Sequence, residues 1–357
     1  RMVMLLGLLV LAEARFLLIP EPVSNTIIGP NVDGPLQSIT VDEPLMLHNE
    51  GSNFVYFLEE NNNVVNKLDF ISQTFTNEFA GKSGNSASTD GIGSNARFDS
   101  PTGWDWENEN NMLIVEWTSG RIRRLNVLNR EVTTLLGIWI SEPTDIKVSR
   151  LRSVAYVSSI QEDDHIWRVN LTNNELSQFT GQSSEAACSQ SNPTRADGGA
   201  SCARFLRPYA MALYNNEIFI ADGRSSSDYH IRKIDLFEAE VTTVAVENDF
   251  PYSGDYGFSD LQAVSFTDST QETENATHLM IVDHLQHLIW QLRLEDRNVT
   301  AFAGSGTSGN TDGIGTNISF QGPWGILYIP SSNDLVVSTE TSVVQIKSPT
   351  TSNPTTV

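Results

Sequence analysis

A glycine loop that recurs along the chain is the feature that most limits what this sequence can fold into. The segment DGIGSNARFDSPTGWDW at 90–106 returns as DGIGTNISFQGPWGILYI at 312–329 and, with an inserted cysteine, as DGGASCARFLRPYAMAL at 197–213. A phosphate-binding glycine loop is followed by a helix whose free N–H groups hold the anion, whereas β-rich runs such as NNMLIVEW follow here. The loop is therefore predicted to belong to a repeated β fold.

The repeating unit contains short runs with strand character. In the second unit, the runs after the glycine loop and first strand are NMLIVEW, GRIRRLNV and EVTTLLG. Four strands at a period of about 40 to 60 residues are typical of a β-propeller, and segments with helix periodicity are almost absent. The sequence predicts an all-β, six-bladed β-propeller of four-stranded antiparallel blades. The first strands of the six units are expected to begin at Pro44, Pro101, Pro143, Pro208, Leu261 and Pro323.

The sixth unit lacks a fourth strand, because the run SVVQIKS leads into a Ser/Thr/Pro-rich tail. A matching segment stands before the first complete unit, where NTIIG resembles the outer runs VTTLLG and VTAFAG. Residues 23–29 are therefore predicted to form the outer strand of the last blade. Such pairing closes the ring and removes an open sheet edge.

This pattern resembles the NHL-repeat β-propellers, whose units combine a DG-x-G loop, an Ala-Arg-Phe triplet, Pro-x-Gly-Ile and a final Val-Thr-Thr-x-x-Gly. The unit at 90–137 matches nearly end to end, the fourth unit matches with its insertion, and the sixth matches through its first strand. The resemblance covers most of the chain after the leader and implies a six-bladed propeller. It implies no single activity, because this fold carries unrelated functions.

The N-terminal residues have the composition of a signal peptide. Arg1 precedes an apolar run at 2–11, and Ala12-Glu13-Ala14 forms a small-x-small cleavage site. The run is much shorter than the ~20 apolar residues of a spanning helix, and a buried first strand is the other interpretation. We expect a signal peptide at 1–14, the NHL-type propeller at 15–347 and a Ser/Thr/Pro-rich tail or linker at 348–357.

Secretion predicts glycans and a disulfide, and candidate residues for both are present. Cys188 and Cys202 are the two cysteines, flank one insertion, and are expected to form a disulfide in an oxidising compartment. The further His or Cys ligands of a metal site do not lie beside them in the sequence. N-linked glycans are expected at four Asn-x-Ser/Thr sequons: Asn170, Asn275, Asn298 and Asn317.

The charge of the chain limits its partners. It has 22 Lys and Arg against 44 Asp and Glu, a net charge of −22, which repels phosphate backbones and anionic lipid surfaces. We therefore expect no nucleic-acid partner, and no segment is long enough to span a membrane. The period-2 spacing of Arg121 and Arg123 in the second unit, where Arg124 and Arg130 also lie, favours pairing with carboxylates over contacts with phosphate.

Structural roles are favoured for the repeated loop. Its glycines allow a positive φ, and Asp90 or Asp312 can accept backbone N–H bonds in the turn. Phe98, Phe205 and Phe320 are expected to fill the space between adjacent sheets. The loop occurs in several units, which is expected if it packs in every blade, whereas a single active site would need it only once.

No catalytic constellation is visible in the sequence. In the segment DHLQH, Asp283 and His287 resemble a metal-ligand pair, but the repeat itself places them at a turn, and a catalytic zinc needs three converging protein ligands. The acidic runs at 59–63 and 161–164 lack calcium-loop spacing and are interpreted as solvated turns. The histidines are His48, His165, His230, His278, His284 and His287.

The sequence thus predicts a secreted, glycosylated β-propeller that serves as a protein-interaction or structural module. Its expected partners are proteins or further copies of itself, in an extracellular surface assembly or fibre. No catalytic, cofactor-binding or metal-binding residue is assigned, and no cofactor is expected. The alternative is a metal-dependent propeller enzyme that resembles the peptide-amidating lyase or the propeller lactonases, which hold a metal on the propeller axis.

Overall fold

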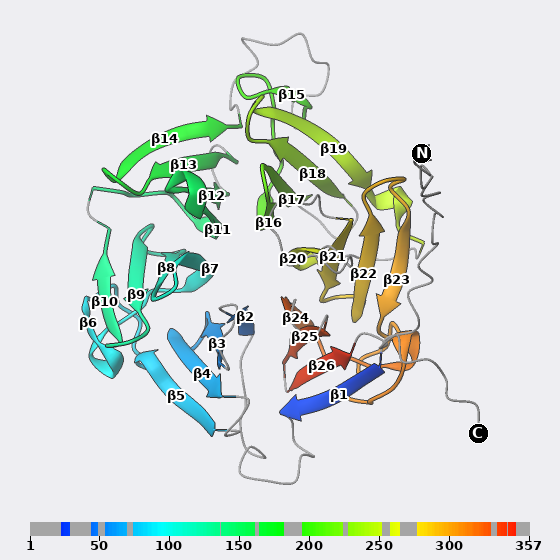
Figure 1. Cartoon of the computed structure of the whole chain (residues 1–357), viewed down its shortest axis with the longest axis horizontal. Helices are drawn as coiled ribbons and strands as arrows, with labels where there is room; N and C mark the ends of the chain where they lie inside the picture. The colour runs from blue at the N-terminus through cyan, green and yellow to red at the C-terminus, as the bar shows by residue number, and fades with distance from the viewer. Residues whose placement is uncertain are drawn as a thin grey trace, which may run out of the picture.

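The computed structural model describes residues 23–28, 44–48, 54–69, 74–135, 137–160, 164–181, 195–223, 228–251, 258–264, 277–329, 334–340 and 342–347. Within these residues the secondary structure is β apart from short 3-10 turns. The strands form six antiparallel sheets, and Figure 1 shows them arranged as blades around an axis. This confirms the predicted all-β propeller. Among the same residues, no helix has the length and apolar character needed to cross a membrane.

Each blade runs from an inner strand beside the axis to an outer strand at the circumference (Figure 1). Blades 1 to 3 contain β2 (Pro44–His48), β3 (Phe54–Glu59), β4 (Val64–Asp69) and β5 (Thr74–Gly81); β7 (Pro101–Asn108), β8 (Asn111–Glu116), β9 (Ile122–Asn126) and β10 (Glu131–Thr134); and β11 (Pro143–Ser149), β12 (Val154–Ser159), β13 (Ile166–Asn170) and β14 (Glu175–Thr180). Blades 4 to 6 contain β16 (Pro208–Tyr214), β17 (Glu217–Gly223), β18 (Tyr229–Asp235) and β19 (Glu240–Val246); β20 (Phe258–Val264), β21 (His278–Asp283), β22 (Leu288–Arg293) and β23 (Val299–Ala303); and β24 (Pro323–Ile329), β25 (Asp334–Thr339) and β26 (Val343–Lys347).

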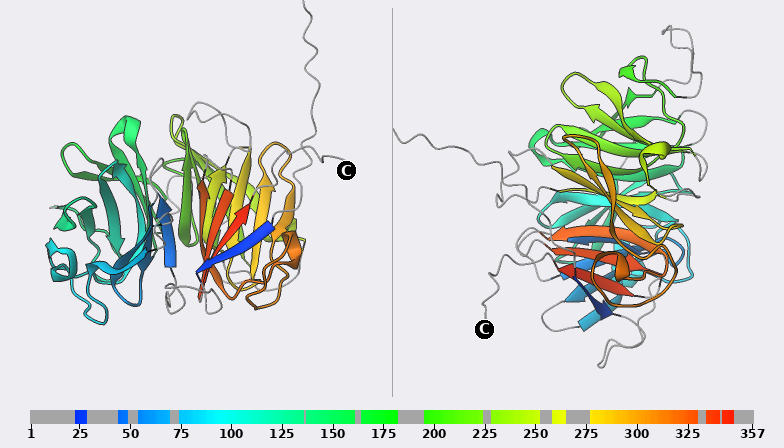
Figure 2. Two further views of the ribbon diagram at one scale, coloured as in Figure 1. Left: turned by 60° about the horizontal axis from the view of Figure 1, so that its bottom comes forward. Right: turned by 90° about the vertical axis from the view of Figure 1, so that its right-hand side faces the viewer.

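An N-terminal strand completes the last blade. Strand β1 (Val23–Ile28) pairs antiparallel with β26, so the sheet order is β1-β26-β25-β24. Figure 2 shows the blue β1 beside the red strands of blade 6. This confirms the predicted ring closure, in which strands from the two ends of the ring share one sheet.

Two details differ from the sequence-based expectation. The inner strand of blade 5 begins at Phe258, not Leu261, because Phe258 pairs with Asp283 as Pro208 pairs with Asp222 in blade 4. The glycine loops also add a short fifth strand to two blades. Strand β6 (Gly91–Ile92) pairs with β10, and β15 (Gly198–Gly199) pairs with β19.

Hydrophobic clusters fill the spaces between neighbouring blades. The middle strands are buried on both faces, as in β12, whose six residues are all buried. Phe98, Phe205 and Phe320 lie in clusters between blades 1 and 2, 3 and 4, and 5 and 6, with exposed fractions of 0%, 4% and 0%. Their predicted role between the sheets is confirmed. Burying each such ring contributes about 1.5–3 kcal/mol.

Buried ion pairs tie the glycine loop to its blade. Arg123 Nη1 lies 2.6 Å from Glu116 Oε1, and both side chains are fully buried. Arg123 Nη2 also contacts the loop residue Asp90 at 2.9 Å. The expected pairing of Arg123 with carboxylates is therefore confirmed, whereas Arg121 donates to the backbone carbonyl of Ser88.

Blade 4 repeats this arrangement with a second arginine. Arg232 contacts Asp222 at 3.0 Å and the loop residue Asp197 at 2.8 Å. Arg195 also contacts Asp222 at 3.0 Å, and its other amino group reaches Asp228 at 2.8 Å. Both loop aspartates thus serve the fold, and Asp197 also accepts the backbone N–H of Thr243 on the outer strand β19 at 2.9 Å.

The acidic run at 59–63 corrects one interpretation. Glu59 ends β3 and is only 2% exposed, so it is not part of a solvated turn. Its carboxylate accepts hydrogen bonds from the side chains of Asn62 and Asn66. Glu59 thus occupies in blade 1 the strand end that Glu116 occupies in blade 2.

Two glycines that follow outer strands allow a matched test of packing. At Gly304 φ is +104°, and a Cβ would lie 2.4 Å from the carbonyl oxygen of His287. At Gly137 φ is +77°, but a Cβ would meet no atom within 4 Å. We expect G137A to cost about 1–2 kcal/mol from the left-handed backbone alone. G304A should cost about 1–3 kcal/mol more because it also overpacks the turn. Urea unfolding measures both, and equal losses would contradict the packing argument.

Candidate functional site

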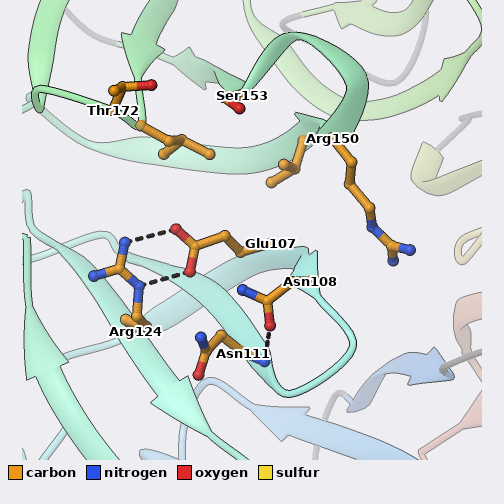
Figure 3. Close-up of a pocket in the computed structure, with 9 residues that line it drawn as sticks. Glu107, Asn108, Asn111, Arg124, Arg150, Ser153 and Thr172 are labelled. Atoms are coloured by element: carbon orange, nitrogen blue, oxygen red, sulfur yellow. Dashed lines mark hydrogen bonds and ion pairs between the residues drawn. The ribbon is translucent and has the colours of Figure 1, made fainter.

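A polar groove lies between blades 2 and 3, at the end of the ring where each inner strand turns into the second strand. It is a cavity of about 380 Å³. Figure 3 shows blade 2 supplying one wall and blade 3 supplying the other. The polar lining residues are Glu107, Asn108, Asn111 and Arg124 from blade 2, and Arg150, Ser153 and Thr172 from blade 3.

An ion pair shapes the blade 2 wall. Arg124 donates two hydrogen bonds of 2.6 Å to the two carboxylate oxygens of Glu107 (Figure 3). Arg124 follows Arg123 on β9, so strand alternation turns the two guanidinium groups to opposite faces of the sheet. Because the pair is bidentate, it holds the wall in one geometry and uses both oxygens of Glu107.

Several donors on the groove walls have no hydrogen-bond partner in the part of the chain that the structure describes. Arg150 donates through Nε to the carbonyl of Trp106 at 3.3 Å, which leaves its two terminal amino groups. Asn108 Oδ1 accepts the backbone N–H groups of residues 110 and 111, and Asn111 Oδ1 accepts the side-chain amide of Asn126. The amide nitrogens of Asn108 and Asn111 have no hydrogen-bond partner among the described residues. The groove therefore presents donors without a hydrogen-bond partner among the described residues on both of its walls.

The 3-10 turn η2 (Arg150–Arg152) forms the rim of the groove on blade 3. Leu151 at its centre is 90% exposed. Arg152 points the other way, donates to Asn216 Oδ1 in blade 4 at 2.5 Å and lies 4.6 Å from the ring of Phe237. The turn thus holds Leu151 outward while the flanking arginines contact the two neighbouring blades.

Two carboxylates on the inner strands join neighbouring blades, Asp105 linking blades 2 and 3 and Asp145 linking blades 3 and 4. Asp105 Oδ2 accepts the backbone N–H of Val148 at 2.7 Å, and Asp145 Oδ2 accepts that of Met211 at 2.8 Å. Burial raises the pKa of both carboxyl groups, and the positive charge of Lys147 opposes the rise. These bonds give both residues a structural role, which the sequence analysis did not foresee.

The histidines do not converge on one site. Among the described residues, no group of three or more His, Cys, Asp or Glu side chains is placed to hold a metal. His287 lies in the turn between β21 and β22, as expected, and its Nδ1 accepts the backbone N–H of Gly322 at 3.2 Å. His284 packs against Trp324 with ring centroids 4.2 Å apart. His165 is 4% exposed and packs against Trp167.

His278 makes the stability of blade 5 depend on pH. Burial and the nearby Arg293 lower the pKa of His278 from 6.5 to about 4. Because the unfolded chain binds this proton near pH 6.5, the free energy of unfolding should fall as pH drops from about 6.5 to about 4. Solvent screening of the half-buried ring reduces the fall to about 2 kcal/mol. H278N should remove this part of the pH dependence. Urea unfolding at about pH 7 and pH 4.5 compares the two proteins, and identical pH dependence would contradict the assignment.

The predicted modification sites are described only in part. Asn298 and Asn317 are exposed, and Asn170 is half-buried at the end of β13. Asn170 Oδ1 accepts the backbone N–H of Thr172 at 2.9 Å. Asn275 and Cys188, like residues 1–14 and 348–357, lie outside the described residues. The glycans, the Cys188–Cys202 disulfide and the leader stay predictions.

The groove itself was missed by the sequence analysis. Arg124 was noted only as one of an arginine cluster, and no signal singled out Asn108 or Arg150. Their placement depends on two blades meeting, and the groove residues span positions 107 to 172. The repeat predicts that the blades meet, but it does not predict which loop side chains face one another.

Sequence comparison relates part of the chain to known NHL-repeat proteins. No family model matches the chain. NHL repeat-containing protein 2 from Bos taurus is 31% identical over 179 residues, which cover 42% of this chain and 24% of the relative. The matched region thus spans about a quarter of the relative's length. The Homo sapiens protein of the same name is 29% identical over 177 residues.

Structure comparison finds the same architecture in distant proteins. An auxiliary nutrient binding protein from Bacteroides ovatus aligns with a TM-score of 0.65 and 12% identity, covering 92% of this chain and 76% of the other. Streptogramin B lyase aligns with a TM-score of 0.53 and 12% identity, covering 92% of this chain and 98% of the other. At such identities the likeness shows the fold alone.

Proposed function

Because the chain is a β-propeller of the NHL type, we propose that it serves as a secreted, glycosylated protein-interaction or structural module in an extracellular assembly. A closed ring of this kind is a rigid support on which loop side chains can be varied without disturbing the blade cores. The proposal concerns what those loops do.

The observation that carries this proposal is the exposure of large apolar side chains on the loops. Leu151, Leu128, Phe237 and Trp139 are 90%, 75%, 71% and 65% exposed. Leu128, Leu151 and Phe237 lie in turns at the end of the ring that carries the groove. Large apolar side chains exposed at one end of a fold are available for contact with other proteins.

The described sequons are compatible with a glycosylated surface. Asn298 lies between β22 and β23, and Asn317 ends the 3-10 turn η5 (Gly315–Asn317), and both side chains are exposed. A glycan at either position would extend into solvent. Secretion supplies the enzymes that attach such glycans, so the sequons and the expected leader support the same compartment.

Expression of the full chain in a secreting eukaryotic cell tests the proposal. We expect the protein in the medium, without residues 1–14, with an intact mass that N-glycosidase lowers and that N298Q and N317Q each lower in part. Light scattering should show a complex with a partner or with further copies. An unglycosylated protein retained in the cell would overturn the proposal. A monomer that keeps one zinc or calcium ion after dialysis would instead support the metal-dependent enzyme.

A further inference from the structure

We propose that an N-linked glycan on Asn170 folds onto blade 4, where its first sugar rings stack on the side chain of Phe237. The structure supplies the attachment atom, the direction of the Asn170 side chain and an aromatic ring that is 71% exposed. This inference rests on the proposed function, because it requires a secreted chain whose sequons carry glycans. It goes further by naming the contact that one of these glycans makes.

The turns that follow the third strands of blades 2, 3 and 4 share one geometry. In each turn the last strand residue accepts, through Oδ1, the backbone N–H of the residue two positions later, and the pairs are Asn126–Leu128, Asn170–Thr172 and Asp235–Phe237. The later residue is apolar and exposed in blades 2 and 4, at 75% for Leu128 and 71% for Phe237. Blade 3, which lies between them in the ring (Figure 1), has the threonine of the sequon there. A glycan on Asn170 therefore starts between two turns that expose apolar side chains.

The side chain of Asn170 is arranged to carry a sugar without loss of its own turn. Its Oδ1 holds the turn through the backbone N–H of Thr172 at 2.9 Å. Its amide nitrogen, the atom to which the glycan is attached, has no hydrogen-bond partner among the described residues. Because Asn170 is half-buried at the end of β13, the first sugar ring begins at the protein surface.

Strand pairing turns Asn170 toward blade 4 and away from the groove. Asn170 lies opposite Val154 in the ladder between β12 and β13, and opposite residues share a face of the sheet. Val154 packs in the cluster between blades 3 and 4, which also contains Leu236, the neighbour of Phe237. Leu171, the next residue along the chain, packs on the other face, in the cluster between blades 2 and 3. The glycan thus starts toward the turn that carries Phe237.

Arg152 spans the space between the sequon and the aromatic ring. Its Nη1 donates to the carbonyl of Leu236 at 3.4 Å, and its guanidinium lies 4.6 Å from the centre of the Phe237 ring. Arg152 stands two residues before Val154, so at about 4.8 Å between strands and about 3.3 Å per residue its Cα lies within about 8 Å of that of Asn170. The first sugars of an N-glycan are long enough to pass over Arg152 and reach the ring.

The ring of Phe237 suits the apolar face of a sugar. The face of a phenyl ring carries partial negative charge, which attracts the C–H groups on one side of a pyranose ring. Arg152 already contacts Phe237 as a cation–π pair, so the sugar covers the part of the ring that is still exposed. The core sugars of an N-glycan carry no net charge, so the net charge of −22 does not oppose the contact. The contact removes Phe237 from the apolar surface and leaves Leu128 and Leu151 for a protein partner.

Endoglycosidase cleavage of the folded, secreted protein tests the contact. The full chain is produced in eukaryotic cells treated with a mannosidase inhibitor, so that each occupied sequon carries the same oligomannose glycan. The enzyme cuts between the first two N-acetylglucosamine rings, and mass spectrometry of glycopeptides follows each site separately. We expect cleavage at Asn170 to be about tenfold slower than at Asn298, because a stacked sugar is closed to the enzyme. Asn298 is the reference because it lies exposed in the turn after the third strand of blade 5.

Matched variants locate the contact. F237A should speed cleavage at Asn170 about tenfold and leave cleavage at Asn298 unchanged. L128A is the control, because Leu128 holds the equivalent exposed position in blade 2, on the side that Asn170 does not face. It should change neither rate, and circular dichroism checks that both variants are folded. The ring current of Phe237 should also move proton resonances of the Asn170-linked sugars upfield, and F237A should abolish that shift.

The outcomes separate this inference from the proposed function. Equal cleavage at Asn170 and Asn298, or slow cleavage at Asn170 that F237A does not change, would overturn the contact with Phe237. Faster cleavage in L128A would place the glycan on blade 2 and overturn it as well. A secreted protein with glycans at Asn298 or Asn317 and none at Asn170 fails this inference alone. An unglycosylated protein that is retained in the cell fails the proposed function.

Discussion

Replacing Arg123 with methionine is expected to lower the free energy of unfolding by about 3–5 kcal/mol. Arg123 and Glu116 are both fully buried and lie 2.6 Å apart. Without the guanidinium, the carboxylate of Glu116 keeps hydrogen bonds from Ser88 and Ser119 but loses the charge that compensates its burial. An uncompensated buried charge costs more than the ion pair itself contributes. Chemical denaturation at neutral pH measures the loss.

The next residue on the same strand is the control. R124M breaks the partly exposed pair with Glu107 and should cost about 1 kcal/mol or less. The double variant R123M/E116Q should recover part of the loss, because it removes both buried charges. Equal losses in R123M and R124M, or no recovery in the double variant, would show that burial of the pair does not govern its energetics.

Truncating Phe320 to alanine is expected to lower the free energy of unfolding by about 3–5 kcal/mol. The ring is fully buried between blades 5 and 6, where it packs with residues such as Val282 and Ile326. Its removal leaves a cavity that the two sheets cannot close, because each is held by its own ladder of hydrogen bonds. Blade 6 is also the blade that joins the two ends of the ring, so this loss should weaken the closure.

An exposed phenylalanine serves as the reference for that measurement. Phe237 is 71% exposed in the turn after β18, and F237A should change stability by about 0.5 kcal/mol or less. The comparison separates loss of packing from loss of an aromatic ring. If F320A cost no more than F237A, the space between blades 5 and 6 would not depend on the ring for its packing.

The repeat made most of the fold predictable. The strand order and the phenylalanines between the blades could be predicted because they recur from unit to unit. The N-terminal strand that completes blade 6 could be predicted because the sixth unit lacks its own fourth strand. The prediction was displaced in blade 5, where Phe258 stands at the position that proline occupies in the other blades. No proline marks the start of this strand, and the predicted start at Leu261 lies three residues too late. The short fifth strands also escaped notice, since their glycines were interpreted as turns only.

The candidate site was much less predictable than the fold. Glu107 and Arg124 lie on two strands of one blade, but Arg150 comes from the next blade. Such residues carry no common spacing or motif, since loops vary from blade to blade while the blade cores repeat. The same reason applies to Asp105 and Asp145, whose bonds to the neighbouring inner strand follow from the distance between blades and not from the alternation within a strand.

The sequence by itself determined the all-β repeat, the closing strand and the residues that pack between sheets. These features follow from the repeat, because corresponding strands of successive units bury equivalent faces against equivalent neighbouring strands. Only the tertiary structure decided which charged groups are buried, as with Glu59 and Arg123. It also decided which donors lack a hydrogen-bond partner among the described residues, as with the terminal amino groups of Arg150. Burial and hydrogen-bond partners depend on residues brought together from different blades, so they appear only when the ring has closed.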